Sequence, residues 1–531
     1  MSLSKLIGSL ERKYLLLILL LLVLIVSFIL KINFVRDLSE YDDTNKDYLV
    51  AKHIVKYQEY LLTGPSNSIF KTIRNSPVYF YLLASPLFVY NDLKFLVIIN
   101  IFLQTITILI IYFLAKELFS KKVGLLAAVI FGFSILTLEH VSYVWQPYVM
   151  QPFVNLSYIL LILGYKKNNY LFLLLSLFIF IFSAAIHISV FVLAPIFIGI
   201  LIWALIKKKY PPRYYLGVGA TFLLSMLIFY LPLLLYLIKN QVNVFISPPN
   251  FYPASLPIIL SHFWSNLIFF VGITVSNMDL INEAVSYIAF LTVLILSIYY
   301  FSVERHINRK KVTIFLLCIV GYLIFFISLL DFNKYSHHLY YYLTPVFGLF
   351  TIVLAEIIGK IFSRNDYLKA TSVSIILIYL ILFVASYKTF LHKSKMPSIF
   401  DKNSSILSSL DKLVDEINLI KRSNGYEDFS FFRLETNEGN NGWKFIPSYM
   451  VALEKTLNAK LTENSDLEVM SFRQLSDYDS KYIFLFCDLN PDLEKINKPC
   501  VQNFLKNRKE YYLIKNIYSD QDKNINLFRR D

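Results

Sequence analysis

The stretch that decides the fold is YLLLILLLLVLIVSFILKI, residues 14–32, which is apolar almost throughout. A helix needs about 20 such residues to cross the hydrocarbon core of a bilayer, which is about 30 Å thick. Lys5, Arg12 and Lys13 precede the stretch, and no small-residue cleavage site follows it. We therefore expect a retained signal anchor rather than a signal peptide that is removed.

Similar apolar runs recur as far as residue 390 and then stop. With 56% hydrophobic and 17% charged residues and a mean hydropathy of +0.55, the 531-residue chain is more apolar than a soluble core allows. We predict a mainly α, polytopic bundle of about eleven spans. These lie near 14–32, 93–114, 122–138, 147–165, 169–186, 188–206, 214–238, 282–301, 312–330, 338–359 and 368–390.

The positive charges of the chain are distributed unevenly between the loops on the two sides of these spans. If the N-terminus is cytoplasmic, 19 Lys and Arg residues fall in inside loops, whereas Lys334 alone falls in the short outside turns. Even the long outside stretch 239–281 has only Lys239. Basic residues of short loops concentrate in the cytoplasm, so we predict a multi-pass plasma-membrane protein with an inside N-terminus. The net charge of +14 therefore gives no reason to expect nucleic acid as a partner.

The chain divides into a transmembrane module, 1–394, and a soluble extracytoplasmic domain, 395–531. Helical patterns at 404–420 and 446–457 alternate with strand-like runs at 429–433 and 482–486, which predicts an α/β domain. Cys487 and Cys500 would lie in an oxidising compartment, where they could either pair or remain two buried thiols.

Two long segments, 33–92 and 239–281, join this domain outside. The first contains an amphipathic pattern that continues to Leu62 and is typical of an interfacial helix, with Gly64 and Pro65 ending it. A second apolar piece, from Pro77 to Tyr90, is too short to span and should form another interfacial helix. We find no internal repeat and almost no ionisable residue at mid-membrane depth, which disfavours a transporter.

Most polar groups that could carry chemistry fall in five outside clusters. They are Tyr41-Asp42-Asp43, Arg74, Glu139-His140 with Trp145-Gln146-Pro147, His187, and His337-His338 with Tyr340, Tyr341 and Tyr342. Each has a structural alternative. The aspartates could cap a helix, the prolyl element could only start one, and the tyrosines could form an aromatic belt. His337 and His338 could be interfacial residues that are hydrogen-bonded to water, and His187 could be structural in a tight turn between two spans.

The order of these motifs resembles the GT-C glycosyltransferases. The similarity is to the glycosyltransferase family 39 branch, with protein O-mannosyltransferase and aminoarabinose-transferase relatives. It rests on Tyr41-Asp42, on Leu62-Thr-Gly64-Pro65, on Pro77-Val-Tyr79-Phe-Tyr81, on Trp145-Gln146-Pro147 and on His337-His338-Leu-Tyr340. It covers about residues 10 to 390, whereas the tail resembles nothing that we can name.

The resemblance implies an inverting transferase that moves one sugar from a polyprenyl-phosphate donor to a lipid, glycan or protein acceptor at the outer membrane face. Asp42 takes the position of the catalytic carboxylate, with Asp43 as the alternative. The expected contacts to the donor phosphate are Arg74, His337, His338 and Tyr341, and those to substrates are Tyr41, Glu139, His140, Trp145 and Gln146.

One departure from the family concerns metal binding. Many relatives have a second acidic residue where this chain reads Trp145-Gln146-Pro147, so either Glu139 substitutes or no second carboxylate is needed. We therefore expect no cofactor and no metal. The alternative functions are a polysaccharide polymerase or ligase and, less favoured, a flippase for lipid-linked glycans.

Overall fold

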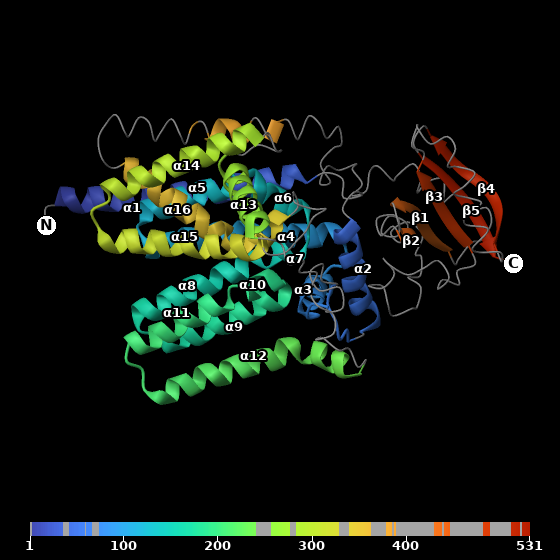
Figure 1. Ribbon diagram of the computed structural model, residues 1–531, viewed down its shortest axis with the longest axis horizontal. Helices are drawn as coiled ribbons and strands as arrows, with labels where there is room; N and C mark the ends of the chain where they lie inside the picture. The colour runs from blue at the N-terminus through green and yellow to red at the C-terminus, as the bar shows by residue number, and fades with distance from the viewer. Residues whose placement is uncertain are drawn as a thin grey trace. The chain divides into compact units, whose positions relative to one another are not determined.

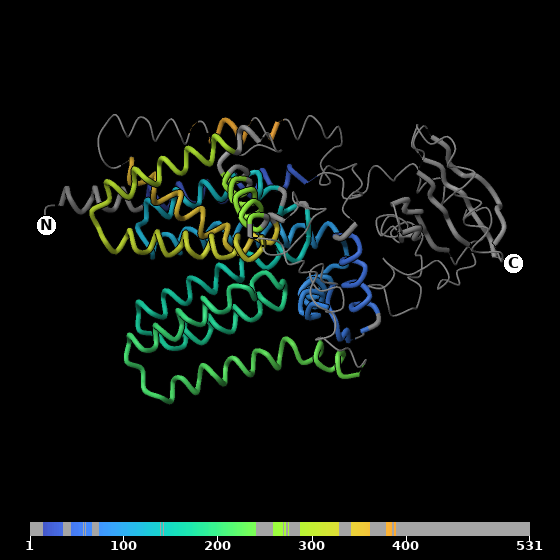
Figure 2. Tube along the Cα trace, viewed as in Figure 1, coloured from blue at the N-terminus to red at the C-terminus, as the bar shows by residue number. Residues whose placement is uncertain are grey.

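The computed structural model describes most of the helical region and five strands of the tail (Figure 2). The described residues are 3–35, 42–58, 60–65, 74–239, 256–276, 283–328, 339–362, 377, 379–384, 387–388, 429–437, 440–445, 482–488, 511–520 and 523–530.

The chain forms two compact units. Unit 1 comprises Met1–Val35, Tyr60–Leu82 and Phe95–Lys395, and unit 2 comprises Arg36–Glu59, Leu83–Lys94 and Met396–Asp531. Helix α3 (Val78–Leu87) is divided between the two units, and α4 (Leu93–Leu118) lies almost wholly in unit 1.

Unit 1 is a bundle of helices, most of which run side by side (Figure 1). Besides α4, its helices are α1 (Leu3–Phe34), α5 (Lys121–Gly132), α6 (Ile135–Ser142), α7 (Gln146–Val149), α8 (Gln151–Lys167), α9 (Tyr170–Ile186), α10 (Ile188–Phe191), α11 (Ala194–Lys207), α12 (Pro212–Lys239), α13 (Leu256–Ser276), α14 (Glu283–Val303), α15 (Ile307–Ser328), the 3-10 helix η1 (Leu339–Leu343) and α16 (Thr344–Phe362). Helix α9 packs between α8 and α12, and α16 packs against α5 and α15.

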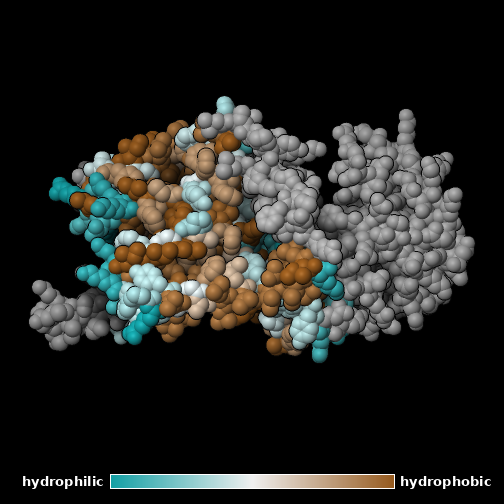
Figure 3. Space-filling model, turned by 60° about the horizontal axis from the view of Figure 1, so that its bottom comes forward, coloured by the Kyte–Doolittle hydropathy of each residue, from teal (hydrophilic) through white to brown (hydrophobic). Residues whose placement is uncertain are grey.

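The sides of this bundle are apolar. Exposed leucines and isoleucines continue along α1, α12 and α14, and hydrophobic side chains cover much of the visible bundle surface (Figure 3). Six helices of the described chain are long and apolar enough to cross a membrane. They are Tyr14–Phe34, Leu93–Leu118, Gln146–Lys167, Pro212–Lys239, Ile307–Ser328 and Tyr341–Ile361, and each matches a predicted span. The full count of eleven and the side that each end faces stay predictions.

The predicted span 122–138 is wrong as a single helix, because it breaks after Gly132 into α5 and α6. Two side-chain hydroxyl groups donate hydrogen bonds to backbone carbonyl oxygens at the break. Ser27 Oγ donates to the Gly132 carbonyl oxygen at 3.0 Å, and Thr137 Oγ1 donates to that of Phe131 at 3.0 Å. The break turns α6 into a separate short helix. The predicted span 188–206 likewise divides into α10 and α11.

Helix α13 lies within the predicted outside stretch 239–281, for which the sequence predicted no helix. Its 21 residues make a helix about 31 Å long, at 1.5 Å per residue, and it packs against α14 and α15. Residues 256–276 are therefore part of the helical bundle, and the side of the membrane that the stretch faces stays a prediction.

Unit 2 contains α2 (Asp42–Tyr57) and a five-stranded sheet. The predicted helix near its start is confirmed, but it ends at Tyr57 instead of Leu62, because Gln58 takes a left-handed conformation with φ of 54°. The strands are β1 (Phe429–Asn437), β2 (Asn440–Phe445), β3 (Tyr482–Asp488), β4 (Tyr511–Asp520) and β5 (Lys523–Arg530).

The sheet has the order β2-β1-β3-β5-β4. Only β1 and β3 pair in parallel, with Phe429 opposite Tyr482, and the other neighbours are antiparallel. The two strands expected from the sequence are β1 and β3, whereas β2, β4 and β5 were not predicted. The predicted helices 404–420 and 446–457 and the partner Cys500 lie outside the described residues, so the α/β assignment and the disulfide stay predictions.

Candidate functional site

Six aromatic side chains from distant parts of unit 1 form one connected group, which we call the aromatic cluster: His140, Trp145, Tyr148, His187, Tyr341 and Tyr342. The ring of His140 stacks on Tyr148 with centroids 4.0 Å apart, and Tyr148 meets Trp145 at 5.8 Å. Trp145 in turn lies 4.7 Å from Tyr341, which is 4.3 Å from Tyr342, and His187 is 5.4 Å from Tyr342. The cluster thus joins α6, α7, η1 and the turn between α9 and α10.

Asn75, which follows Arg74 in the chain, forms a hydrogen bond to Gln146, the residue next to Trp145 of the aromatic cluster. The side-chain amide of Asn75 donates to Gln146 Oε1 at 3.2 Å, and Gln146 begins α7 directly after Trp145. The backbone of Asn75 also pairs with Gly64 and Pro65, at 2.8 and 3.0 Å. Tyr79, further along, donates to the Val144 carbonyl oxygen at 2.9 Å. The Gly64-Pro65 turn and Pro77-Val-Tyr79 element therefore both serve to place Arg74 and Asn75 beside residues 144–146.

A layer of buried amides holds the backbone that carries Trp145. From α4, Asn100 Nδ2 donates to the carbonyl oxygens of His140 and Val141 at 3.1 and 3.3 Å, and Gln104 Nε2 donates to that of Tyr148 at 2.7 Å. The side chains of Asn100 and Gln104 are almost fully buried. Polar groups in such positions stabilise a structure only when they are hydrogen-bonded, so they fix the path of residues 140–148.

His140 and His187 are both uncharged in the folded protein. Burial lowers the pKa of His140 to about 3, the hydrogen bond to Gln151 opposes this, and the Lys31 charge lowers it further. Its Nδ1 lies 3.3 Å from Gln151 Oε1. Burial likewise lowers the pKa of His187 to about 3, and its Nδ1 lies 2.7 Å from Ser189 Oγ. Neither ring therefore offers positive charge to a phosphate, and the contacts of His187 support its structural interpretation.

The structure thus brings together four of the predicted site residues, His140, Trp145, Gln146 and Tyr341, and places the backbone of Arg74 next to them. Asp42 and Asp43 occupy the first turn of α2 in unit 2, and Glu139 lies in α6. The structure describes the backbone of these three residues only. Tyr41, His337 and His338 lie outside the described residues. Their predicted roles stay predictions.

Sequence reasoning missed Lys31, Asn100, Gln104, Gln151 and Asn155. All five are 0–2% exposed and lie in apolar helices of unit 1. The signal was present in the sequence, because amide and lysine side chains are rare inside spans and usually face the bundle interior. In the part of the chain that the structure describes, no three His, Cys, Asp or Glu side chains come together as metal ligands would.

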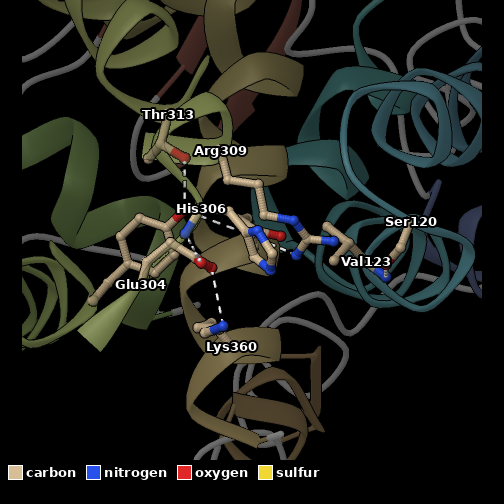
Figure 4. A network of polar contacts seen from close by, with 9 residues as sticks. Ser120, Val123, Glu304, His306, Arg309, Thr313 and Lys360 are labelled. Carbon is tan, nitrogen blue, oxygen red and sulfur yellow. Dashed lines mark hydrogen bonds and ion pairs between the residues drawn. The ribbon is translucent and has the colours of Figure 1, made fainter. Parts of the chain in front are cut away.

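A second polar network fastens α14, α15 and α16 (Figure 4). Glu304 and Lys360 form an ion pair at 3.2 Å, and Glu356 and Arg309 form another at 3.2 Å. Burial alone would raise the pKa of Glu304, but the His306 backbone N–H and the Lys360 ammonium outweigh it and hold the pKa below its ordinary value. Both carboxylates already have cationic partners, so this network is structural.

No protein-family model matches the sequence, and no curated protein matches it either. Among solved structures, the chain is similar to ArnT from Cupriavidus metallidurans bound to undecaprenyl phosphate. The TM-score is 0.55 at 9% identity, covering 97% of this chain and 98% of that one. The apo state of the same ArnT gives a TM-score of 0.56 at 9% identity, covering 98% of each chain. The Archaeoglobus fulgidus oligosaccharyltransferase AglB, in complex with an inhibitory peptide and a dolichol-phosphate, is also similar. Its TM-score is 0.41 at 13% identity, covering 74% of this chain and 59% of that one. Along almost its whole length, the chain therefore has the fold of the GT-C glycosyltransferase ArnT, as the resemblance of its motifs predicted.

Proposed function

We propose that this chain is a membrane glycosyltransferase that takes a single sugar from a polyprenyl-phosphate donor and passes it, with inversion, to an acceptor outside the cytoplasm. The observation that carries the proposal is the meeting of His140, Trp145, Gln146 and Tyr341 in one cluster. Small-molecule sites are typically lined by aromatic side chains with a few fixed polar groups, and this cluster has both.

The ArnT-like fold supports a lipid-linked donor, because that ArnT was solved with undecaprenyl phosphate. In the proposed reaction, the acceptor oxygen forms a bond to the anomeric carbon while the bond from that carbon to the phosphate oxygen breaks. The electron pair leaves with the phosphate, and the acceptor proton passes to the carboxylate of Asp42. Asp43, one residue further along α2, is the alternative base.

Arg74, Tyr341, His337 and His338 are the proposed contacts to the donor phosphate, since arginine can hold a phosphate by two parallel hydrogen bonds. The remaining predicted residues, Tyr41, Glu139, His140, Trp145 and Gln146, would contact the sugar or the acceptor. The proposal includes a plasma-membrane location with the N-terminus in the cytoplasm, and a lipid, glycan or protein as acceptor.

The test uses purified full-length protein in liposomes, labelled polyprenyl-phosphate sugars and a membrane extract of the host as acceptor. We expect Asp42→Asn to lower the transfer rate by a factor of about 10² to 10⁴, the usual contribution of a general base. Asp43→Asn tests the alternative base one residue away and should retain transfer if Asp42 is the base. Wild-type transfer by the Asp42 variant would exclude that base, and no transfer by the wild-type protein from any such donor would exclude the reaction.

A further inference from the structure

Lys31 is the most unusual charged residue of unit 1. It lies near the end of α1, less than one helical turn before Phe34, and its side chain is 0% exposed. A lysine near the end of a span normally extends to the interface, where water solvates its ammonium group. Lys31 does not, because neighbouring residues of α1 pack inward. Phe34 and Leu30 belong to a core with Ile135, Leu138 and Phe383.

The ammonium group has no partner in the part of the chain that the structure describes. Lys31 Nζ is buried without a hydrogen bond, and no carboxylate of the described residues forms an ion pair with it. An uncompensated buried charge is strongly unfavourable, and apolar side chains of similar volume serve a core at least as well. An ionisable side chain buried at membrane depth is by default a candidate functional residue, and its partner is then sought beyond the protein chain.

The surroundings of Lys31 indicate the chemistry of that ligand. Lys31 is close enough to His140 for a charge on Lys31 to lower the pKa of that imidazole, and His140 Nδ1 lies 3.3 Å from Gln151 Oε1. This contact orients the Gln151 amide, whose Nε2 is buried and lacks a hydrogen-bond partner. An ammonium group has three N–H donors and an amide nitrogen has two. Unused donors on an amide and on an ionisable amine fit a group that is rich in acceptor oxygens, and a negatively charged group would favour the ammonium form of Lys31. An oxyanion such as a phosphate meets both conditions.

We propose that Lys31, with the side-chain amide of Gln151, binds the phosphate of the polyprenyl carrier. This inference rests on the proposed function and adds to it the group that stabilises the leaving phosphate. When the bond from the anomeric carbon to the phosphate oxygen breaks, the phosphate gains the electron pair and one negative charge. A fixed cation at that point stabilises the transition state more than the ground state, and no proton needs to move.

The test measures the melting temperature of the full-length protein in detergent, alone and with increasing undecaprenyl phosphate, undecaprenol or inorganic phosphate. We expect undecaprenyl phosphate to stabilise the wild-type protein and undecaprenol to have little effect. Lys31→Met should weaken the apparent affinity for the lipid phosphate by at least about tenfold, and Lys31→Arg, which keeps the charge, by less. Lys239→Met, at the exposed end of α12, is the control and should bind as the wild type does.

A second readout separates ligand binding from a structural role. Without ligand, Lys31→Met should melt at the wild-type temperature or above it, because it removes a buried polar group that has no hydrogen-bond partner. A large loss of stability would overturn the proposal, since it would assign the ammonium group an internal partner. Unchanged affinity of Lys31→Met for the lipid phosphate would also overturn it, while leaving the proposed transfer reaction intact. Equal stabilisation by inorganic phosphate would overturn the assignment to the lipid carrier.

Discussion

The indole of Trp145 and the phenol ring of Tyr341 lie 4.7 Å apart, although one precedes α7 and the other belongs to η1, far along the chain. Their rings are inclined at 57°. This contact joins the part of the aromatic cluster formed by His140, Tyr148 and Trp145 to the part formed by Tyr341, Tyr342 and His187. The four predictions below concern residues around it.

Removing either ring should weaken substrate binding more than it weakens folding. We expect Trp145→Ala and Tyr341→Ala each to raise the KM of transfer by about tenfold or more, since buried aromatic contacts dominate the energetics of binding surfaces. Because the rings touch, the double variant should lose less than the product of the single losses. Trp203→Ala, which removes an exposed indole from α11, is the matched control and should leave KM unchanged. Independent effects of the two substitutions would contradict a shared site.

Asn100→Leu should destabilise unit 1 and slow transfer. The substitution keeps the size of the side chain but leaves the carbonyl oxygens of His140 and Val141 without their donor. Each lost bond to a buried acceptor costs about 1–3 kcal/mol, so the melting temperature should fall by several degrees. Asn33→Leu, whose exposed amide binds the Ile29 carbonyl oxygen within α1, is the control. Equal melting temperatures for the two variants would show that residues 140–148 do not depend on Asn100.

Gly64→Ala should reduce the rate of transfer because it displaces the backbone of Arg74 and Asn75. A Cβ atom at Gly64 would overlap the backbone carbonyl of Ser76, which cannot move away as a flexible side chain would. The Gly64-to-Asn75 backbone pairing would open, and with it the contact of Asn75 with Gln146. We expect transfer at limiting donor to fall by about 10-fold, within the range that small misplacements cause. The control is Gly199→Ala in α11, where a Cβ atom meets nothing within 4 Å.

The free energy of unfolding should decrease as the pH falls, because the two buried histidines are neutral in the folded protein. An unfolded histidine has a pKa of about 6.5, whereas burial lowers the pKa of His140 and His187 to about 3. The unfolded state therefore binds more protons between these values. The stability that the neutral rings contribute is fully present above about pH 6.5 and is lost as the pH falls towards about 3. The slope approaches about 1.4 kcal/mol per pH unit for each histidine.

The measurement is the melting temperature in detergent from pH 8 to pH 4. His187→Asn keeps a hydrogen-bonding group opposite Ser189 but cannot titrate, so its melting curve should fall less steeply than that of the wild type. Parallel curves would mean that His187 does not contribute to the acid sensitivity.

Sequence reasoning found the membrane bundle because long apolar runs are a signal of composition, independent of packing. It singled out Trp145, Gln146 and Tyr341 because polar and aromatic residues between spans stand out against apolar neighbours, and the structure places Trp145 beside Tyr341. Their roles stay predictions. It could not find the break between α5 and α6, because that depends on Ser27 of another helix reaching the Gly132 carbonyl. It did not predict α13 either, because 239–281 was treated as one outside segment between two spans, with its low charge taken as support for that side.

Lys31 illustrates a different limit. In the sequence it is one charged residue near the end of an apolar run, a position where lysines usually reach the interface. Only the packing of α1 against α6 and the residues near Phe383 shows that its side chain is enclosed. The amides of Gln104 and Asn155 are similar cases, since their partners are backbone oxygens, which no sequence pattern identifies.

The way in which α4 holds residues 140–148 has a consequence for how this kind of protein can diversify. Asn100 and Gln104 recognise only main-chain oxygens there, and main-chain oxygens are the same whatever side chains the segment bears. The side chains at 145 and 146 can therefore be exchanged without losing the scaffold that presents them. The path of the main chain through residues 140–148 is therefore set from α4, separately from the side chains that the segment presents.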